Sequence, residues 1–181
     1  GAAAVLGRGE RVVLVDLPSG EIAAERVIPG EPTVSLTWAA DGKEIVAGGL
    51  AGRLHFLAAD ELAQVAPTRL VTGGFVVDLE TSQDGRLVAS MGSDGDVTLW
   101  DTATWRPLGQ PITDDEEWGW LHFGDDRLRI FYENGTLVEV PVDPSVWLQR
   151  ACQAANRDLT AEESAIVRPG QPLRSTCAGV Q

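Results

Sequence analysis

The side chains that could do acid–base chemistry are few and lie far apart in this chain. It has two histidines, His55 and His122. Both fall in short stretches of alternating apolar and polar residues, 53–57 and 120–123, a pattern that predicts strands. No neighbouring acid, cysteine or serine completes a catalytic set around either imidazole. We therefore interpret both as sheet residues, and we expect no catalytic residue and no enzyme activity.

The two cysteines, Cys152 and Cys177, lie near the C-terminus. Together with two distant histidines they do not make a four-ligand zinc site, so we expect no metal and no cofactor. The favoured interpretation is a pair of reduced thiols in a cytoplasmic protein, and a disulfide is the alternative that the sequence leaves open.

Serines and glycine pairs give no better sign of chemistry. Ser82, Ser90 and Ser93 occupy turn or strand positions, which argues against a nucleophile. The pairs Gly48-Gly49 and Gly73-Gly74 precede neither a helix start nor a Lys-Ser/Thr pair, so they are predicted turns and not phosphate-binding loops.

One acidic stretch beside tryptophans is the candidate binding surface. Aromatic residues next to charges are typical of interaction hot spots, which favours a binding loop. The alternative is a solvated acidic loop whose tryptophans, Trp118 and Trp120, pack between neighbouring sheets. The candidate binding residues are Asp114, Asp115, Glu116, Glu117 and Trp118.

The overall charge narrows the choice of partner. The chain has 14 Lys and Arg against 27 Asp and Glu, a net charge of −13. Such a surface repels phosphate backbones, so we expect no direct nucleic-acid contact and favour a basic protein partner. No apolar run approaches the roughly 20 residues that span a bilayer, so we expect no membrane partner.

Internal repeats predict the elements that position these residues. Residues 34–57, 77–100 and 120–140 superpose, and a weaker copy opens the chain at residues 2–16. The pair Asp41-Gly42 recurs 43 residues later as Asp84-Gly85. Each unit consists of short alternating strands joined by turn dipeptides. A period of about 40–45 residues with four strands is that of a β-propeller blade.

Residues 82–101, which end in Trp100-Asp101, closely resemble the WD40 signature. Residues 107–113 look like the linker between blades of actinobacterial WD40 proteins. The resemblance implies an all-β fold, a partial WD40-type propeller over residues 1–142. The family's usual histidine is missing from all three corresponding places, so we expect blade rigidity to depend more on apolar packing between sheets.

The strands predict about four blades, of which the first and last are incomplete. With strands lettered a to d from the inside outward, the first unit supplies b, c and d at 2–6, 11–16 and 22–27. Each of the next two units supplies all four strands, with the outer strands near residues 62–66 and 105–108. The last unit supplies strands a, b and c. We therefore predict an open arc, the C-terminal half of a larger ring, that oligomerises or aggregates when expressed alone.

Residues 143–181 are predicted to form a short helical cap. Asp143 is a suitable N-cap and Pro144 suits the first turn, while Thr160 and Glu163 form a capping-box pattern for a second helix to about Val167. One apolar helix face is predicted from Trp147, Leu148, Ala151, Cys152 and Ala155. The region resembles the C-terminal cap of large actinobacterial proteins in which a propeller follows a signalling ATPase or a transcriptional-regulator module.

The predicted function is that of a non-catalytic protein–protein interaction scaffold, the partner-binding end of a larger bacterial signalling protein. Its expected partner is a protein, with a basic one favoured, or the rest of its own propeller. Two alternatives stay open. One is the regulatory domain of a transcriptional regulator or ATPase whose activity lies upstream; the other is an enzyme or small-molecule sensor with a site in the central channel.

Overall fold

A computed structural model describes residues 3–39, 42–113, 118–167, 170–172, 175 and 177 of the chain. The polypeptide divides into two compact units, Gly1–Glu139 and Val140–Gln181. Each unit is described by itself below. In the described part of the chain, no helix is both long enough and apolar enough to cross a membrane.

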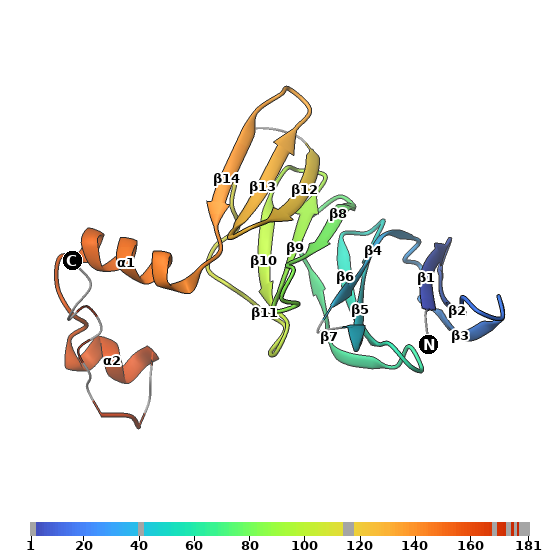
Figure 1. The fold of residues 1–181 in the computed structure, drawn as a ribbon, viewed down its shortest axis with the longest axis horizontal. Coiled ribbons are helices and arrows are strands. Elements are labelled where there is room, and N and C mark those ends of the chain that lie inside the picture. Colours follow the sequence, from blue (N-terminus) through green and yellow to red (C-terminus); the bar gives the residue numbers. More distant parts are fainter. Residues whose placement is uncertain are drawn as a thin grey trace. The chain divides into compact units, whose positions relative to one another are not determined.

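The first unit consists of four antiparallel sheets (Figure 1). Strands that neighbour one another in the sequence pair within each sheet, so every sheet is a meander. The first sheet contains β1 (Ala3–Arg8), β2 (Arg11–Asp16) and β3 (Ile22–Val27). The second contains β4 (Thr33–Ala39), β5 (Glu44–Gly49), β6 (Arg53–Ala58) and β7 (Gln64–Leu70). The third contains β8 (Val76–Thr81), β9 (Leu87–Gly92), β10 (Val97–Asp101) and β11 (Arg106–Pro107), and the fourth β12 (Gly119–Gly124), β13 (Arg127–Tyr132) and β14 (Leu137–Pro141).

These strands confirm the mostly β class and the predicted succession of three, four, four and three strands. The outer strands begin slightly later than predicted, at Gln64 and Arg106. The residues before them, Leu62 and Trp105, lie in turns instead, with φ angles of 55° and 50°. In the described part of the chain the sheets follow one another without closing on themselves (Figure 1).

Neighbouring sheets meet along their first strands, where β1 contacts β4, β4 contacts β8 and β8 contacts β12. The Thr37 and Thr81 hydroxyls lie 2.9 Å apart, and the Thr81 hydroxyl donates to the carbonyl of Trp38 at 2.6 Å. Between the third and fourth sheets, the amide of Leu121 donates to an Asp78 carboxylate oxygen at 2.8 Å. Polar contacts thus join the sheets where their first strands adjoin.

Apolar side chains fill the space between the sheets. The first and second sheets share a buried cluster whose main members are Val12, Leu14, Ile28, Ile45, Ala47, Leu57 and Leu62. The second and third share another, with Val46, Leu54, Phe56, Val76, Leu79, Val88, Trp100 and Trp105. The Phe56 ring lies 4.4 Å from that of Trp105 and 6.1 Å from that of Trp100. This confirms the expected apolar packing between sheets.

One turn position recurs in three sheets and explains part of this packing. The amides of Leu62 and Trp105 each donate to the carbonyl four residues earlier, and both side chains are buried against the preceding sheet. Trp105 also donates its Nε1 to the Glu44 carboxylate at 2.6 Å. Positive φ is unfavourable for large residues, so the buried contacts must offset a cost of about 1–2 kcal/mol at each position. In the first sheet the equivalent residue is Gly20, which has no side chain to insert.

The second unit contains α1 (Pro144–Ala155) and α2 (Ala161–Val167). Both predicted caps are confirmed. An Asp143 carboxylate oxygen accepts from the amide of Ser145 at 2.8 Å. Thr160 and Glu163 exchange the two bonds of a capping box, at 2.8 and 3.2 Å. Of the residues on the predicted apolar face of α1, Cys152 is the buried one. A unit this small has little apolar surface with which to cover a helix.

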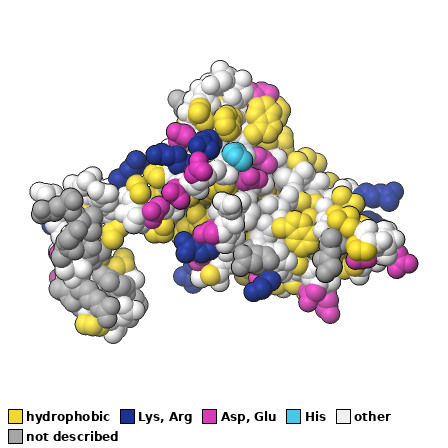
Figure 2. Space-filling view, in the orientation of Figure 1, with side chains coloured by type: hydrophobic (Ala, Val, Ile, Leu, Met, Phe, Trp, Pro, Cys, Tyr) yellow, Lys and Arg dark blue, Asp and Glu magenta, His cyan; other side chains and the backbone are white. Residues whose placement is uncertain are grey.

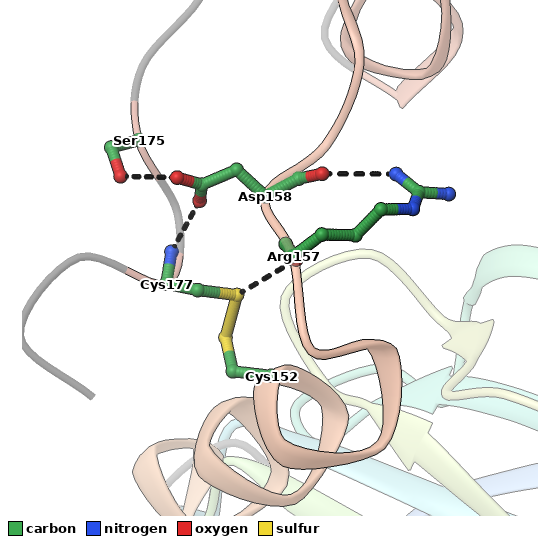
Figure 3. Close-up of a disulfide and its surroundings, with 5 residues drawn as sticks. All are labelled: Cys152, Arg157, Asp158, Ser175 and Cys177. Atoms are coloured by element: carbon green, nitrogen blue, oxygen red, sulfur yellow. Dashed lines mark hydrogen bonds between the residues drawn. A yellow bond between two sulfur atoms is a disulfide. The ribbon is translucent and has the colours of Figure 1, made fainter. Parts of the chain in front are cut away.

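The two cysteines form a disulfide, which corrects the expectation of reduced thiols. Their Cα atoms lie 5.5 Å apart. Figure 3 shows how Asp158 holds the second cysteine: its carboxylate accepts from the amide of Cys177 at 2.7 Å and from the hydroxyl of Ser175 at 2.6 Å. The sequence spacing did not reveal that this turn brings the two sulfurs together. Disulfides persist mainly in oxidising compartments, which favours such a location over the expected cytoplasm.

Candidate protein-binding rim

One hairpin turn of each sheet lies on the same side of the first unit, next to the segments that enter the first strands. We call this side the rim; it comprises the turns at 9–10, 50–52, 93–96 and 133–136 and the segments that enter β4, β8 and β12. Four backbone hydrogen bonds define it. The amide of Thr33 donates to the carbonyl of Gly9 at 2.8 Å, and that of Val71 to the carbonyl of Gly52 at 2.9 Å. The amide of Ser93 donates to the carbonyl of Phe75 at 2.9 Å, and that of Glu133 to the carbonyl of Trp118 at 3.2 Å. Each bond ties one turn to the segment that enters a first strand.

A buried carboxylate holds the rim of the second sheet. Glu31 is only 4% exposed. One of its oxygens accepts from the amides of Ala51 and Arg53 at 3.1 and 3.4 Å, and the other accepts from the Arg53 guanidinium at 3.3 Å. Glu31 occupies one of the places where the resemblance predicts a histidine, and it fixes the turn in that role.

In the third sheet a threonine performs a similar task. The hydroxyl of Thr72 donates to Asp94 at 2.6 Å and accepts from the amide of Gly74 at 3.2 Å. Lower in the same sheet, Trp100 Nε1 donates to the hydroxyl of Ser90 at 2.9 Å. Polar contacts as well as apolar packing therefore hold these sheets, and the sequence analysis expected only the apolar packing. A buried acid directly after Gly30 was the available signal.

Three large apolar side chains of the rim are exposed to solvent. The exposed fractions are 54% for Leu50, 38% for Phe75 and 37% for Trp118. The Trp118 ring lies 6.0 Å from that of Trp120, which is 53% exposed. Neither of these two tryptophan rings is buried. Aromatic and aliphatic side chains on an otherwise polar surface can bury area against a partner.

The four acids of the candidate binding loop, Asp114, Asp115, Glu116 and Glu117, lie outside the described residues. The fifth candidate, Trp118, is the first described residue after them. It lies on the rim, because its carbonyl accepts a hydrogen bond from the amide of Glu133 in the turn at 133–136. The sequence therefore places four carboxylates directly before an exposed tryptophan.

His122 has an acidic neighbour that the sequence analysis did not find. Its Nδ1 lies 3.6 Å from a carboxylate oxygen of Glu80, which belongs to the adjoining first strand β8. Partial burial, and secondarily the charge of Asp78, raise the pKa of Glu80. The pair forms across two sheets, between residues more than forty positions apart in the sequence, so no local pattern revealed it.

His55 lies in β6 as predicted, with its Nδ1 3.3 Å from the hydroxyl of Thr68. Burial lowers the pKa of this imidazole. The three serines make local hydrogen bonds. The hydroxyl of Ser82 donates to Asp84 at 2.7 Å, and that of Ser93 accepts from the amide of Phe75 at 3.2 Å, while Ser90 bonds to Trp100. Within the described ranges no three His, Cys, Asp or Glu side chains are grouped to hold a metal ion.

Comparison with known proteins places the fold. No family model and no curated protein matches the chain. Among solved structures, the crystal structure of the computationally designed Ika4 protein is similar, with a TM-score of 0.69 at 17% identity. The match covers 79% of this chain and 87% of the designed one. At this identity the similarity concerns the fold alone.

Proposed function

We propose that the four sheets are blades of a WD40-type β-propeller and that the chain is a non-catalytic scaffold which binds a protein partner through its rim. The observation that supports the proposal most directly is the set of exposed apolar side chains on the rim, Leu50, Phe75 and Trp118. They lie on or beside turns that the side chains of Glu31 and Thr72 hold in place. A binding surface on a preorganised frame loses less conformational entropy when the partner docks.

The partner's chemistry follows from charge. The chain has a net charge of −13, and Asp114, Asp115, Glu116 and Glu117 directly precede Trp118. We propose a basic peptide segment with one or two apolar anchors, which would pair its cations with the acids and its apolar side chains with the exposed rim residues.

The test is a selection of random peptides on the immobilised chain, followed by affinity measurement with one selected peptide. We expect basic peptides to be enriched. A rim variant carrying Leu50→Ser, Phe75→Ser and Trp118→Ser should bind at least tenfold more weakly. The matched control carries Ile166→Ser and Val167→Ser, since both of these apolar side chains are exposed but belong to α2.

The acids are tested separately by replacing all four with serine. This variant should bind the peptide more weakly at low salt, and the difference should shrink at high salt because exposed charges are screened beyond about 8 Å at physiological ionic strength. Equal binding at low salt would support the solvated-loop alternative. Peptides that bind the rim variant as well as they bind the wild type would refute the rim proposal.

A further inference from the structure

The outer strand of the second sheet, β7, pairs with β6 through an interrupted ladder. On β6, Leu54 pairs with one residue of β7, and Phe56 pairs with the residue three positions before that one. Two residues of β7, Pro67 and Thr68, therefore lie opposite the single residue His55, which makes a β-bulge. Because proline has no amide hydrogen, Pro67 cannot donate to the ladder. The backbone attachment of β7 is thus weakest beside His55.

Side-chain hydrogen bonds bridge this interruption. His55 Nδ1 lies 3.3 Å from the hydroxyl of Thr68. The side-chain amide of Gln64 donates to the same hydroxyl at 3.3 Å and to the carbonyl of Ala66 at 2.9 Å. Gln64, Ala66 and Thr68 all belong to β7, so the imidazole is the group of β6 that holds this small network.

The imidazole of His55 faces the first sheet. Its partner in the ladder is Ala47, and opposed residues of an antiparallel pair point to the same face. Ala47 belongs to the buried cluster that the first and second sheets share. The other ring nitrogen, Nε2, is buried there and has no hydrogen-bond partner among the described residues. One nitrogen of the ring is thus bonded, while the other is closed off from water without a partner.

The charged groups that act on this ring come from three places. Burial lowers the pKa of His55 most; Glu31 then raises it, while Arg26 and Arg53 lower it. Arg26 belongs to β3, on the same face as the buried Val12, and donates to the carbonyl of Leu62 at 3.1 Å. The Glu31 carboxylate already binds the Arg53 guanidinium and two backbone amides.

The other elements around the ring supply no charge. The facing residues of β2 and β5, Val12, Leu14 and Ala47, are apolar, and those of β7, Gln64 and Thr68, are neutral. Cationic side chains are outnumbered in this chain, 14 to 27, and on the face shown in Figure 2 they lie in separate small groups. Two guanidinium groups close to one imidazole therefore make this part of the second sheet unfavourable for a further cation.

We propose that His55 is an acid-sensitive attachment of β7, and that protonation of its imidazole releases this outer strand from β6. A neutral imidazole has one donor and one acceptor nitrogen, whereas the imidazolium has two donors. Protonated His55 would bury a charged Nε2–H without an acceptor, which is costly. Movement of the ring into solvent removes this cost but breaks the contact with Thr68. Since the backbone ladder is interrupted at the same place, β7 then loses its attachment there.

Release of β7 should also reach the rim. The strand leads directly into the segment that enters β8, where the amide of Val71 donates to the carbonyl of Gly52 at 2.9 Å. Loss of the β7 attachment should therefore loosen this rim bond as well. The proposal depends on His55 and on no rim ligand, so it can fail while peptide binding at the rim stands.

The first test is an NMR titration of the histidine side chains in the unmodified full chain, with His122→Gln used to assign the signals. We expect His55 to titrate below the ordinary pKa of 6.5, because the folded chain favours the neutral ring. Titration of His55 at or above 6.5 would overturn the proposal. This measurement does not depend on the folding of a His55 variant.

The second test compares hydrogen-exchange protection factors between about pH 5 and pH 8. A lowered pKa means that the attachment is complete above 6.5 and weakens as the pH falls below it. Protection of β7 and of the Val71 amide should fall by up to about tenfold for each pH unit below 6.5, the limit for one proton, while β5 stays protected.

A non-titrating variant shows whether His55 is the responsible group. Asparagine can bond to Thr68 but cannot gain a proton in this range, so His55→Asn should make the protection of β7 independent of pH. The matched control His122→Asn should keep the pH dependence of the unmodified chain. Protection of β7 that does not change with pH in the unmodified chain, or a loss that persists in His55→Asn, would overturn the proposal.

Discussion

Buried polar side chains at the rim carry information that the repeat pattern alone did not reveal. In the sequence, Glu31 only marks a place where the histidine of the WD40 signature is missing. In the structure, its carboxylate accepts hydrogen bonds from the amide of Ala51 and from the guanidinium of Arg53. The His122–Glu80 pair escaped notice for a related reason, since its members belong to different sheets. Sequence patterns identify residues that alternate along one strand, whereas contacts across strands depend on how the sheets are placed.

Replacing Glu31 with alanine should destabilise the first unit by about 1–3 kcal/mol, because the amides of Ala51 and Arg53 then lose their buried acceptor. Thermal unfolding followed by circular dichroism measures the effect. Glu61→Ala, which removes an exposed acid, is the matched control and should change stability by less than about 0.5 kcal/mol. A Glu31 variant as stable as this control would contradict the role assigned to the carboxylate.

Glu80 should give the fold a pH dependence of known sign. Its pKa is raised in the folded state above the ordinary 4.5, chiefly by burial, so folding favours the protonated acid. The stability that protonation contributes is fully present below pH 4.5 and is lost as the pH rises through the raised pKa. We therefore expect Glu80→Gln to increase the melting temperature at pH 7 and to have a smaller effect below pH 4.5. A gain that grows toward acid pH would contradict the sign of this shift.

At the scale of single elements, the strands and helix caps could be predicted well and the turns less well. Alternation and turn dipeptides located the strands, and Asp143, Thr160 and Glu163 located the helix starts, because these signals are local. Leu62 and Trp105 lie in turns and not in the predicted outer strands, although large apolar residues seldom adopt positive φ. Burial against the preceding sheet, which no local pattern reveals, decides their conformation.

Trp105 should therefore contribute more to the stability of the first unit than an exposed tryptophan does. Trp105→Ala should destabilise the first unit by about 3–5 kcal/mol, since it removes the contact with Phe56 and leaves a cavity. Trp118→Ala is the matched control and should cost far less, because that ring is 37% exposed. Denaturant unfolding of the two variants compares them directly. Similar losses for both would show that the turn residue does not hold the sheets together.

The disulfide belongs to the second unit, so its reduction should destabilise that unit and not the first. A cross-link that closes a loop of this length contributes about 3 kcal/mol in the chain-entropy account. We expect dithiothreitol to lower the hydrogen-exchange protection of α1 and α2 while the strands of the first unit keep theirs. The double variant Cys152→Ser and Cys177→Ser should show the low protection without reductant. Loss of strand protection on reduction would contradict this division.

At the scale of the whole molecule, composition and repeats predicted the mostly β class, the order of the strands and the sheet each belongs to. Hydrogen bonds between the turns and the segments that enter the first strands join the parts of the chain that carry Leu50, Phe75 and Trp118 to the rim.

The most direct test of the account is hydrogen exchange of the full chain with and without a selected basic peptide. We expect added protection at the turns 50–52, 93–96 and 133–136 and at the segments that enter β8 and β12. The exposed residues of α2 should not change. Protection confined to the inner strands around His122 and Glu80, or to the second unit, would contradict the proposal that the rim of a propeller arc is the binding surface.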